Sequence, residues 1–152
     1  MKTSVHFLCG AFVLVLMSLF FYFMYPRDSV QDGYYTAEAK DFDDHGWKEF
    51  VTIFVSGGKI TTVEYNAKNS SGFIKSWDMD YMRLMNAWGG IYPSAYMRAY
   101  AADLLTKQDV EKIDAVSGAT HSYHAFKQLA TAIMKKIIEG DTSVAFVELS
   151  HD

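Results

Sequence analysis

Residues 121–140 read HSYHAFKQLATAIMKKIIEG, and this stretch has the pattern of a long amphipathic helix. Two lysines stand in its last turns, where they complement the helix dipole, and Gly140 is the residue type that ends helices in a left-handed conformation. We therefore predict a helix over residues 121–139 that packs one face against a core. Apolar side chains at i, i+3 and i+4 spacing form that face: Phe126, Leu129, Ala130, Ile133, Met134 and Ile137.

Three segments before this helix have the composition of β-strands. Residues 33–39 (GYYTAEA), 49–55 (EFVTIFV) and 59–65 (KITTVEY) are rich in β-branched and aromatic residues. Residues 56–58 (SGG) separate the last two, which predicts an antiparallel hairpin. Strict alternation along 59–65 gives one face with Ile60, Thr62 and Glu64, and another with Thr61, Val63 and Tyr65.

Two further helices and a last strand complete the predicted order. Residues 77–88 (WDMDYMRLMNAW) carry an apolar stripe at helical spacing, formed by Tyr81, Leu84, Met85 and Trp88. Pro93 suits the first position of the next helix, whose stripe is Tyr96, Met97, Tyr100, Ala101, Leu104 and Leu105. We expect both stripes to lie in the core, and residues 143–149 (SVAFVEL) to form a final strand. The order predicts a single α+β domain with antiparallel strands packed against helices.

The N-terminal 25 residues differ in composition from the rest. Residues 5–25 contain no Asp, Glu, Lys or Arg, and about 20 such residues span the hydrocarbon core of a bilayer as a helix. Residues 21–25 (FYFMY) are bulky, unlike a signal-peptidase site. We predict an uncleaved membrane anchor over residues 1–27 and a domain over 28–152. Cys9 has too short an apolar run before it for a lipoprotein signal, and a thiol in a lipid-facing helix explains it better.

Charges on both sides of the anchor predict its orientation. Lys2 and the amino terminus precede the anchor, and Arg27 follows it beside Asp28. With one predicted anchor, we expect the chain to be a single-pass protein of the cell membrane. The charges predict its orientation because Lys and Arg stay preferentially in the cytoplasm. Its N-terminus is then cytoplasmic, and residues 28–152 lie on the extracytosolic side.

The composition of residues 28–152 excludes several kinds of site. They hold 12 Lys and Arg against 18 Asp and Glu, because Lys2 and Arg27 lie outside them, so their net charge is −6. An acidic domain without a basic stripe is a poor nucleic-acid binder. The absence of cysteine from 28–152 excludes disulfides and Cys-ligated clusters there. His121 and His124 lack a third nearby ligand, so no metal site is predicted.

Residues 114–124 (DAVSGATHSYH) hold more small and hydroxylated residues than a helix start requires. One hydroxyl suffices as an N-cap, whereas Ser117, Thr120 and Ser122 offer three. One interpretation is a plain N-cap at Thr120 or Ser122, with Gly118 in the turn. The other is an anion site, because unpaired N–H groups and the positive end of the helix dipole bind phosphate or carboxylate.

The segment DAVSGATHS of residues 114–122 resembles the flavinylation motif of the FMN-binding domain family. This family includes the C subunit of the sodium-translocating NADH:quinone reductase and the G subunit of the Rnf complex. The succession of DGYYTAEA, GGKITTVEY and KQDVEKIDAVSGATHS is also similar to the family, over residues 32–139. The resemblance implies that a flavin transferase joins the FMN moiety of FAD, through its phosphate, to a hydroxyl of this segment.

Position by position, the resemblance makes Thr120 the acceptor and Ser122 the alternative acceptor. It implies that Asp114 positions the acceptor, or a metal during transfer. The residues implied to line the phosphate end are Ser117, Gly118 and Ala119. Candidate neighbours of the flavin ring are Tyr81, Trp88, Tyr92 and Tyr96, although core packing explains each of them better.

The resemblance predicts an electron carrier with covalent, phosphoester-linked FMN rather than a complete enzyme. A covalent tether keeps the cofactor on the protein on the extracytosolic side of the membrane, where no flavin pool replaces a lost cofactor. The expected partners are a flavin transferase for maturation, a membrane dehydrogenase or quinone-linked electron donor, and a downstream redox acceptor. The main alternative is a binding or adaptor module of the same fold that holds flavin or another phosphate ligand noncovalently. A structural subunit of a larger membrane complex is the third possibility.

Overall fold

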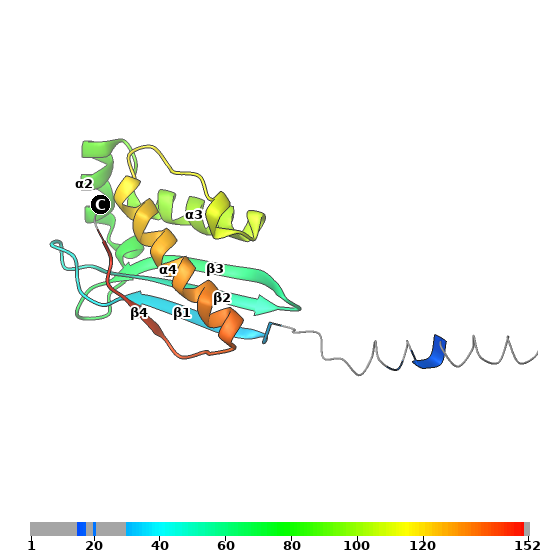
Figure 1. Ribbon diagram of the computed structural model, residues 1–152. Helices are drawn as coiled ribbons and strands as arrows, with labels where there is room; N and C mark the ends of the chain where they lie inside the picture. The colour runs from blue at the N-terminus through cyan, green and yellow to red at the C-terminus, as the bar shows by residue number, and fades with distance from the viewer. Residues whose placement is uncertain (1–14, 18–19, 21–29, 151–152) are drawn as a thin grey trace, which may run out of the picture.

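The computed structural model describes residues 15–17, 20 and 30–150 (Figure 1). Residues 15–17 and 20 are helical, and the rest of the predicted anchor lies outside the described residues. Within the described ranges, no helix is both long and apolar enough to cross a membrane. The anchor and its single-pass topology therefore stay predictions.

A four-stranded sheet forms one layer of the domain. Its strands are β1 (Gly33–Ala39), β2 (Lys48–Ser56), β3 (Lys59–Lys68) and β4 (Ala145–Val147), in the spatial order β3-β2-β1-β4. The pairs β1–β2 and β2–β3 are antiparallel as predicted. The prediction of antiparallel strands is wrong for β4, which runs parallel to β1. The reason is that the preceding helix ends beside the start of β1, where Gly140 lies against Gln31, so the chain enters β4 from the same end of the sheet.

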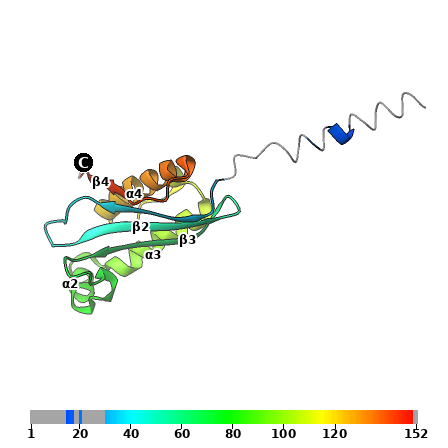
Figure 2. The ribbon, with the colours of Figure 1, turned by 90° about the horizontal axis from the view of Figure 1, so that it is seen from below.

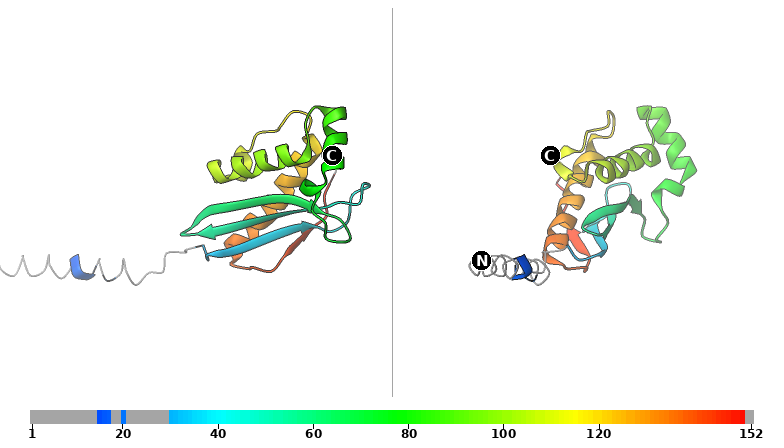
Figure 3. Two further views of the ribbon diagram at one scale, coloured as in Figure 1. Left: turned by 180° about the vertical axis from the view of Figure 1, so that it is seen from behind. Right: turned by 90° about the vertical axis from the view of Figure 1, so that its right-hand side faces the viewer.

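Three α-helices follow β3 in the chain. They are α2 (Met79–Gly89), α3 (Pro93–Lys107) and α4 (Thr120–Glu139), with short 3-10 turns at η1 (Lys75–Trp77) and η2 (Val110–Lys112). In Figures 2 and 3, α3 and α4 cover one face of the sheet, with α3 over β3 and α4 over β1 and β2. Helix α2 lies at the end of the sheet where α4 begins (Figure 1). The α+β class and the position of each helix agree with the sequence analysis.

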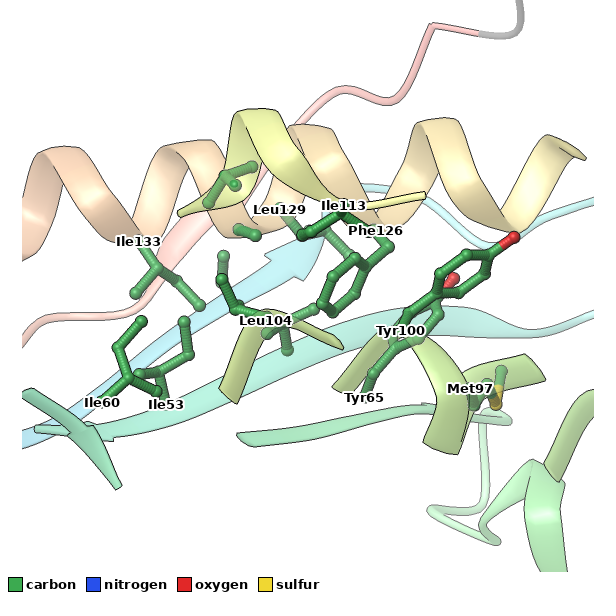
Figure 4. Packing of buried hydrophobic residues seen from close by; sticks show 14 of the residues in the cluster. Ile53, Ile60, Tyr65, Met97, Tyr100, Leu104, Ile113, Phe126, Leu129 and Ile133 are labelled. Atoms are coloured by element: carbon green, nitrogen blue, oxygen red, sulfur yellow. The ribbon is translucent and has the colours of Figure 1, made fainter. Parts of the chain in front are cut away.

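The core lies between the sheet and the inner faces of α3 and α4 (Figure 4). The predicted stripe of α4 is buried, with Met134 at its border, and most of the α3 stripe is buried as well. The prediction of a buried stripe on α2 is wrong, because Leu84 is 48% and Trp88 is 81% exposed. Instead α2 buries Met82, and Tyr81 packs against Trp47 at the end of the sheet. An apolar face of α2 is thus left open.

A β-bulge changes which residues of β3 face the core. Val55 pairs with Ile60 and Phe54 pairs with Thr62, so Thr61 is an extra residue opposite that step. The bulge moves Ile60 onto the same face as Val63 and Tyr65, and the strict alternation expected for 59–65 is therefore wrong. The Gln108 side chain then occupies this strand edge, accepting from the Ile60 N–H at 2.8 Å and donating to its carbonyl at 2.9 Å.

Candidate functional site

The segment that precedes α4 forms a tight turn. The Ala119 N–H donates to the Val116 carbonyl at 3.0 Å, and Gly118 has a φ of 82°, as the third residue of a type II turn requires. Helix α4 then begins at Thr120, and its N-cap residue, Ala119, provides no side-chain cap. The predicted N-cap at Thr120 or Ser122 is therefore wrong, because both residues lie inside the first turn.

The two candidate acceptor hydroxyls have different environments. Thr120 is exposed at the first helical position, whereas Ser122 is only 9% exposed. Around them, Ser117 and Gly118 are exposed and Ala119 is buried. The structure thus brings five of the six predicted residues together at the start of α4, and solvent reaches Thr120 more freely than Ser122.

Buried tyrosines hold this turn from below. The Tyr100 hydroxyl donates to the Ala119 carbonyl at 3.0 Å and accepts from the Val116 N–H at 3.2 Å, so it contacts both ends of the turn. The Tyr65 hydroxyl lies 3.1 Å from the Ser122 carbonyl oxygen and 2.8 Å from Oε2 of Glu49. Figure 4 shows Tyr65 and Tyr100 beside α4. Two different elements, β3 and α3, therefore fix the first turn of α4.

The buried environment beneath the start of α4 favours the protonated form of Tyr65 and Tyr96. Burial and the Glu49 carboxylate raise the pKa of Tyr65 well above its usual value. Burial also raises the pKa of Tyr96 to about 12, although a hydrogen bond with the Ser122 side chain opposes the shift. Sequence reasoning missed this network, because residues 49 and 65 lie far from 122 in the chain.

Asp114 lies apart from the other predicted residues. Its carboxylate is 2.6 Å from the Lys107 ammonium, and its N–H donates to Asp103 at 2.9 Å. Among the described residues, the Asp114 side chain contacts Lys107 of α3 rather than Thr120. Across all the residues that the structure describes, no group of three or more His, Cys, Asp and Glu side chains could hold a metal ion.

The charge of Asp103, in its cluster with Lys107 and Asp114, should contribute to the stability of the fold at neutral pH. Burial alone would raise the pKa of Asp103, but the Asp114 N–H and the Lys107 ammonium outweigh it and lower the pKa. A lowered pKa stabilises the fold above the unfolded-state value near 3.9, and that stabilisation is lost as pH falls through the folded value. We expect Asp103→Asn to lower the unfolding free energy by about 1 kcal/mol at pH 7.

Urea unfolding at several pH values measures this effect. The difference between Asp103→Asn and the unaltered protein should shrink as the pH is lowered below 4. Asp80→Asn is the control, because its ion pair with Arg83 is exposed and should contribute little. A difference that does not change with pH would contradict the assignment to the Asp103 charge.

A second group of residues, at the end of the sheet where α2 lies, was not anticipated from the sequence. Lys75 of η1 is only 4% exposed, and its Nζ lies 5.7 Å from the centre of the Trp47 ring and 5.2 Å from that of Tyr81. Burial lowers the pKa of Lys75, while Glu49 and Asp43 oppose the shift. Lysine in a polar loop is common, so no sequence pattern distinguishes this one.

Helix α2, whose apolar face is open, lies at the same end of the domain as the start of α4 (Figures 1 and 3). Trp88 is 81% and Tyr92 is 44% exposed, Tyr81 is half-buried and Tyr96 is buried. The candidate ring neighbours therefore divide into accessible aromatic side chains and one core residue.

The start of α4 fits a phosphate ester. The N-cap residue Ala119 supplies no side-chain hydrogen bond, so the positive end of a 20-residue helix lies beside an exposed hydroxyl. A separate cleft of about 710 Å³ lies between β3, η1 and α3. Its lining includes Trp77, Met97 and Arg98 but none of residues 114–122, so we place the candidate site at the turn.

Comparison with known proteins gives one family and several relatives. The model of the family described as FMN-binding domain matches residues 46–135. A 15 kDa lipoprotein of Treponema pallidum (strain Nichols) is 39% identical over 113 residues, which are 74% of this chain and 80% of the relative.

Two solved structures also match this chain. The crystal structure of a Clostridium perfringens protein has a TM-score of 0.75 at 39% identity and covers 80% of this chain and 99% of its own. The solution NMR structure of a Clostridium thermocellum protein has a TM-score of 0.51 at 30% identity and covers 80% of this chain and 98% of its own.

Proposed function

Since the chain belongs to the FMN-binding domain family, we propose that it carries FMN joined through its phosphate to the hydroxyl of Thr120 and works as an electron carrier. The observation that carries this proposal is the environment of Thr120. Its exposed hydroxyl stands at the first position of a long helix whose N-cap supplies no side-chain hydrogen bond. When bound, FMN supplies transfer of one or two electrons.

Attachment forms one bond and breaks one bond, with no change in oxidation state. Oγ1 of Thr120 bonds to the flavin-side phosphorus of FAD, the pyrophosphate P–O bond breaks, AMP leaves and the hydroxyl proton is released. We propose that a flavin transferase carries out this step. The resulting phosphodiester keeps one negative charge, which the N–H groups and dipole of α4 stabilise.

The open aromatic side chains at the same end of the domain as the turn are the proposed contacts of the flavin ring. Trp88 and Tyr92 are exposed and Tyr81 is half-buried, so a planar ring can reach them. Tyr96 is 5% exposed and its ring packs against that of Tyr100, which holds the turn before α4, so we assign it to the support of α4.

Membrane attachment and partners belong to the same proposal. A relative is named a lipoprotein, which supports a membrane-anchored protein. We propose that residues 5–25 anchor this chain, with residues 28–152 on the extracytosolic side. A membrane dehydrogenase or quinone-linked protein would then deliver electrons, and a downstream redox protein would accept them.

The deciding experiment is the intact mass of the exported full chain, produced together with a flavin transferase. We expect an added mass equal to FMN less one water, mapped by fragmentation to residues 114–124. After denaturation and precipitation the yellow colour should stay with the protein. Colour released to the supernatant would support the noncovalent binding module instead, and an unmodified, colourless protein would contradict a flavin carrier.

A further inference from the structure

Lys75 is a charged residue in an unusual position. It lies in the short turn η1, between the loop that precedes β2 and the first turns of α2, and it is 4% exposed. Burying an ammonium group is costly unless other groups compensate for the lost water. Lysine is rarely this buried, so its surroundings should show what the charge is for.

Two aromatic faces are the direct neighbours of the ammonium group. Nζ lies 5.7 Å from the centre of the Trp47 ring and 5.2 Å from that of Tyr81, within the range of cation–π attraction. The carboxylates of Glu49 and Asp43 act on it electrostatically and favour its charged form. Between described residues, however, Lys75 forms no ion pair and donates no hydrogen bond. An ammonium group has three N–H donors, so this one retains the capacity to bind an acceptor.

The position of Lys75 links it to the start of α4. Glu49, which acts on Lys75, lies 2.8 Å from the Tyr65 hydroxyl, and that hydroxyl lies 3.1 Å from the Ser122 carbonyl oxygen. Tyr81, which contacts Lys75, also belongs to the open apolar face of α2. The Lys75 ammonium group thus contacts the ring of Tyr81, which belongs to the aromatic face proposed for the flavin, and it interacts electrostatically with Glu49 of the network beneath the proposed attachment turn.

We propose that Lys75 supplies the positive charge that faces the flavin ring carried on Thr120 and stabilises its reduced form. This inference rests on the proposed function above. Reduction adds two electrons from the donor protein and one proton from water, which leaves the ring with one negative charge. A nearby ammonium group in a poorly solvated site lowers the free energy of that anion more than that of the neutral oxidised ring.

The test compares reduction potentials of the flavin-loaded full chain. Lys75→Met keeps an unbranched apolar side chain and removes the charge. We expect at least a tenfold shift toward the oxidised form at a fixed potential, which is a decrease of ~30 mV for a two-electron couple. Lys75→Arg keeps the charge and should stay near the unaltered value. Lys59→Met is the matched control, because Lys59 is exposed on the turn between β2 and β3 at the other end of the sheet, and it should not change the potential.

Each outcome decides the role of Lys75. An unchanged potential in fully flavinylated Lys75→Met would overturn the inference and leave the proposed function intact. If Lys75→Met and Lys75→Gln both fail to fold while Lys75→Arg folds, the charge serves the fold, which also overturns it. Absence of flavin from the unaltered protein would instead contradict the proposed function, and intact mass separates that case from the others.

Discussion

Thr120→Ala, produced with a flavin transferase, is expected to contain no covalent flavin, whereas the unaltered protein is fully modified. The substitution removes the only atom to which we assign the phosphoester, so the expected loss is complete rather than partial. Thr120 is exposed and lies in the first turn of α4, where alanine is a good helix former, so the fold should be unaffected. Intact mass measures the attached fraction, and circular dichroism checks the fold.

Two matched variants separate the acceptor from its neighbours. Thr120→Ser keeps a hydroxyl at the same position and should still be modified. Ser122→Ala should also be modified, because the Ser122 side chain is only 9% exposed and is therefore poorly placed to accept the flavin. Attachment that persists in Thr120→Ala and disappears in Ser122→Ala would reassign the acceptor to Ser122. That outcome would also mean that the first turn opens during transfer.

Local patterns in the sequence were sufficient to predict the elements that bury the face marked by their own apolar periodicity. The stripes of α3 and α4 and the composition of β1–β3 predicted these elements to within a few residues. Helix α2 has an equally clear stripe, but it contacts the rest of the domain mainly through Met82 and Tyr81. Periodicity shows that a helix has an apolar face, but it does not show whether another element covers that face.

Features that depend on several elements together were not predictable. The direction of β4 follows from the place where α4 ends, and the bulge at Thr61 follows from pairing with β2. The turn at 116–119 was recognised from its small residues, but its missing side-chain cap appears only in the structure. The burial of Lys75 likewise results from packing between η1, α2 and the loop before β2.

Phe126→Ala should cause the largest loss of stability, about 3–5 kcal/mol of unfolding free energy. Phe126 is fully buried on the first half of α4. Its ring centre lies 4.9 Å from that of Tyr65 and 5.7 Å from that of Tyr100, with the Tyr100 ring nearly parallel at 19°. Truncation removes the ring between two tyrosines and leaves a cavity that the sheet and α3 cannot readily fill. Urea unfolding of the exported domain measures the change.

The same substitution tests how the core supports the candidate site. Tyr100 contacts the turn at 116–119 and Tyr65 contacts Ser122, so a cavity between their rings should loosen the first turn of α4. Hydrogen exchange is therefore expected to accelerate at residues 119–123 more than in the α2 region. Phe126→Leu keeps most of the buried volume and should cost clearly less than Phe126→Ala. Equal losses for the two variants would show that the aromatic contacts matter more than the filled volume. Unchanged exchange at residues 119–123 would show that the backbone of the turn holds itself without the tyrosines.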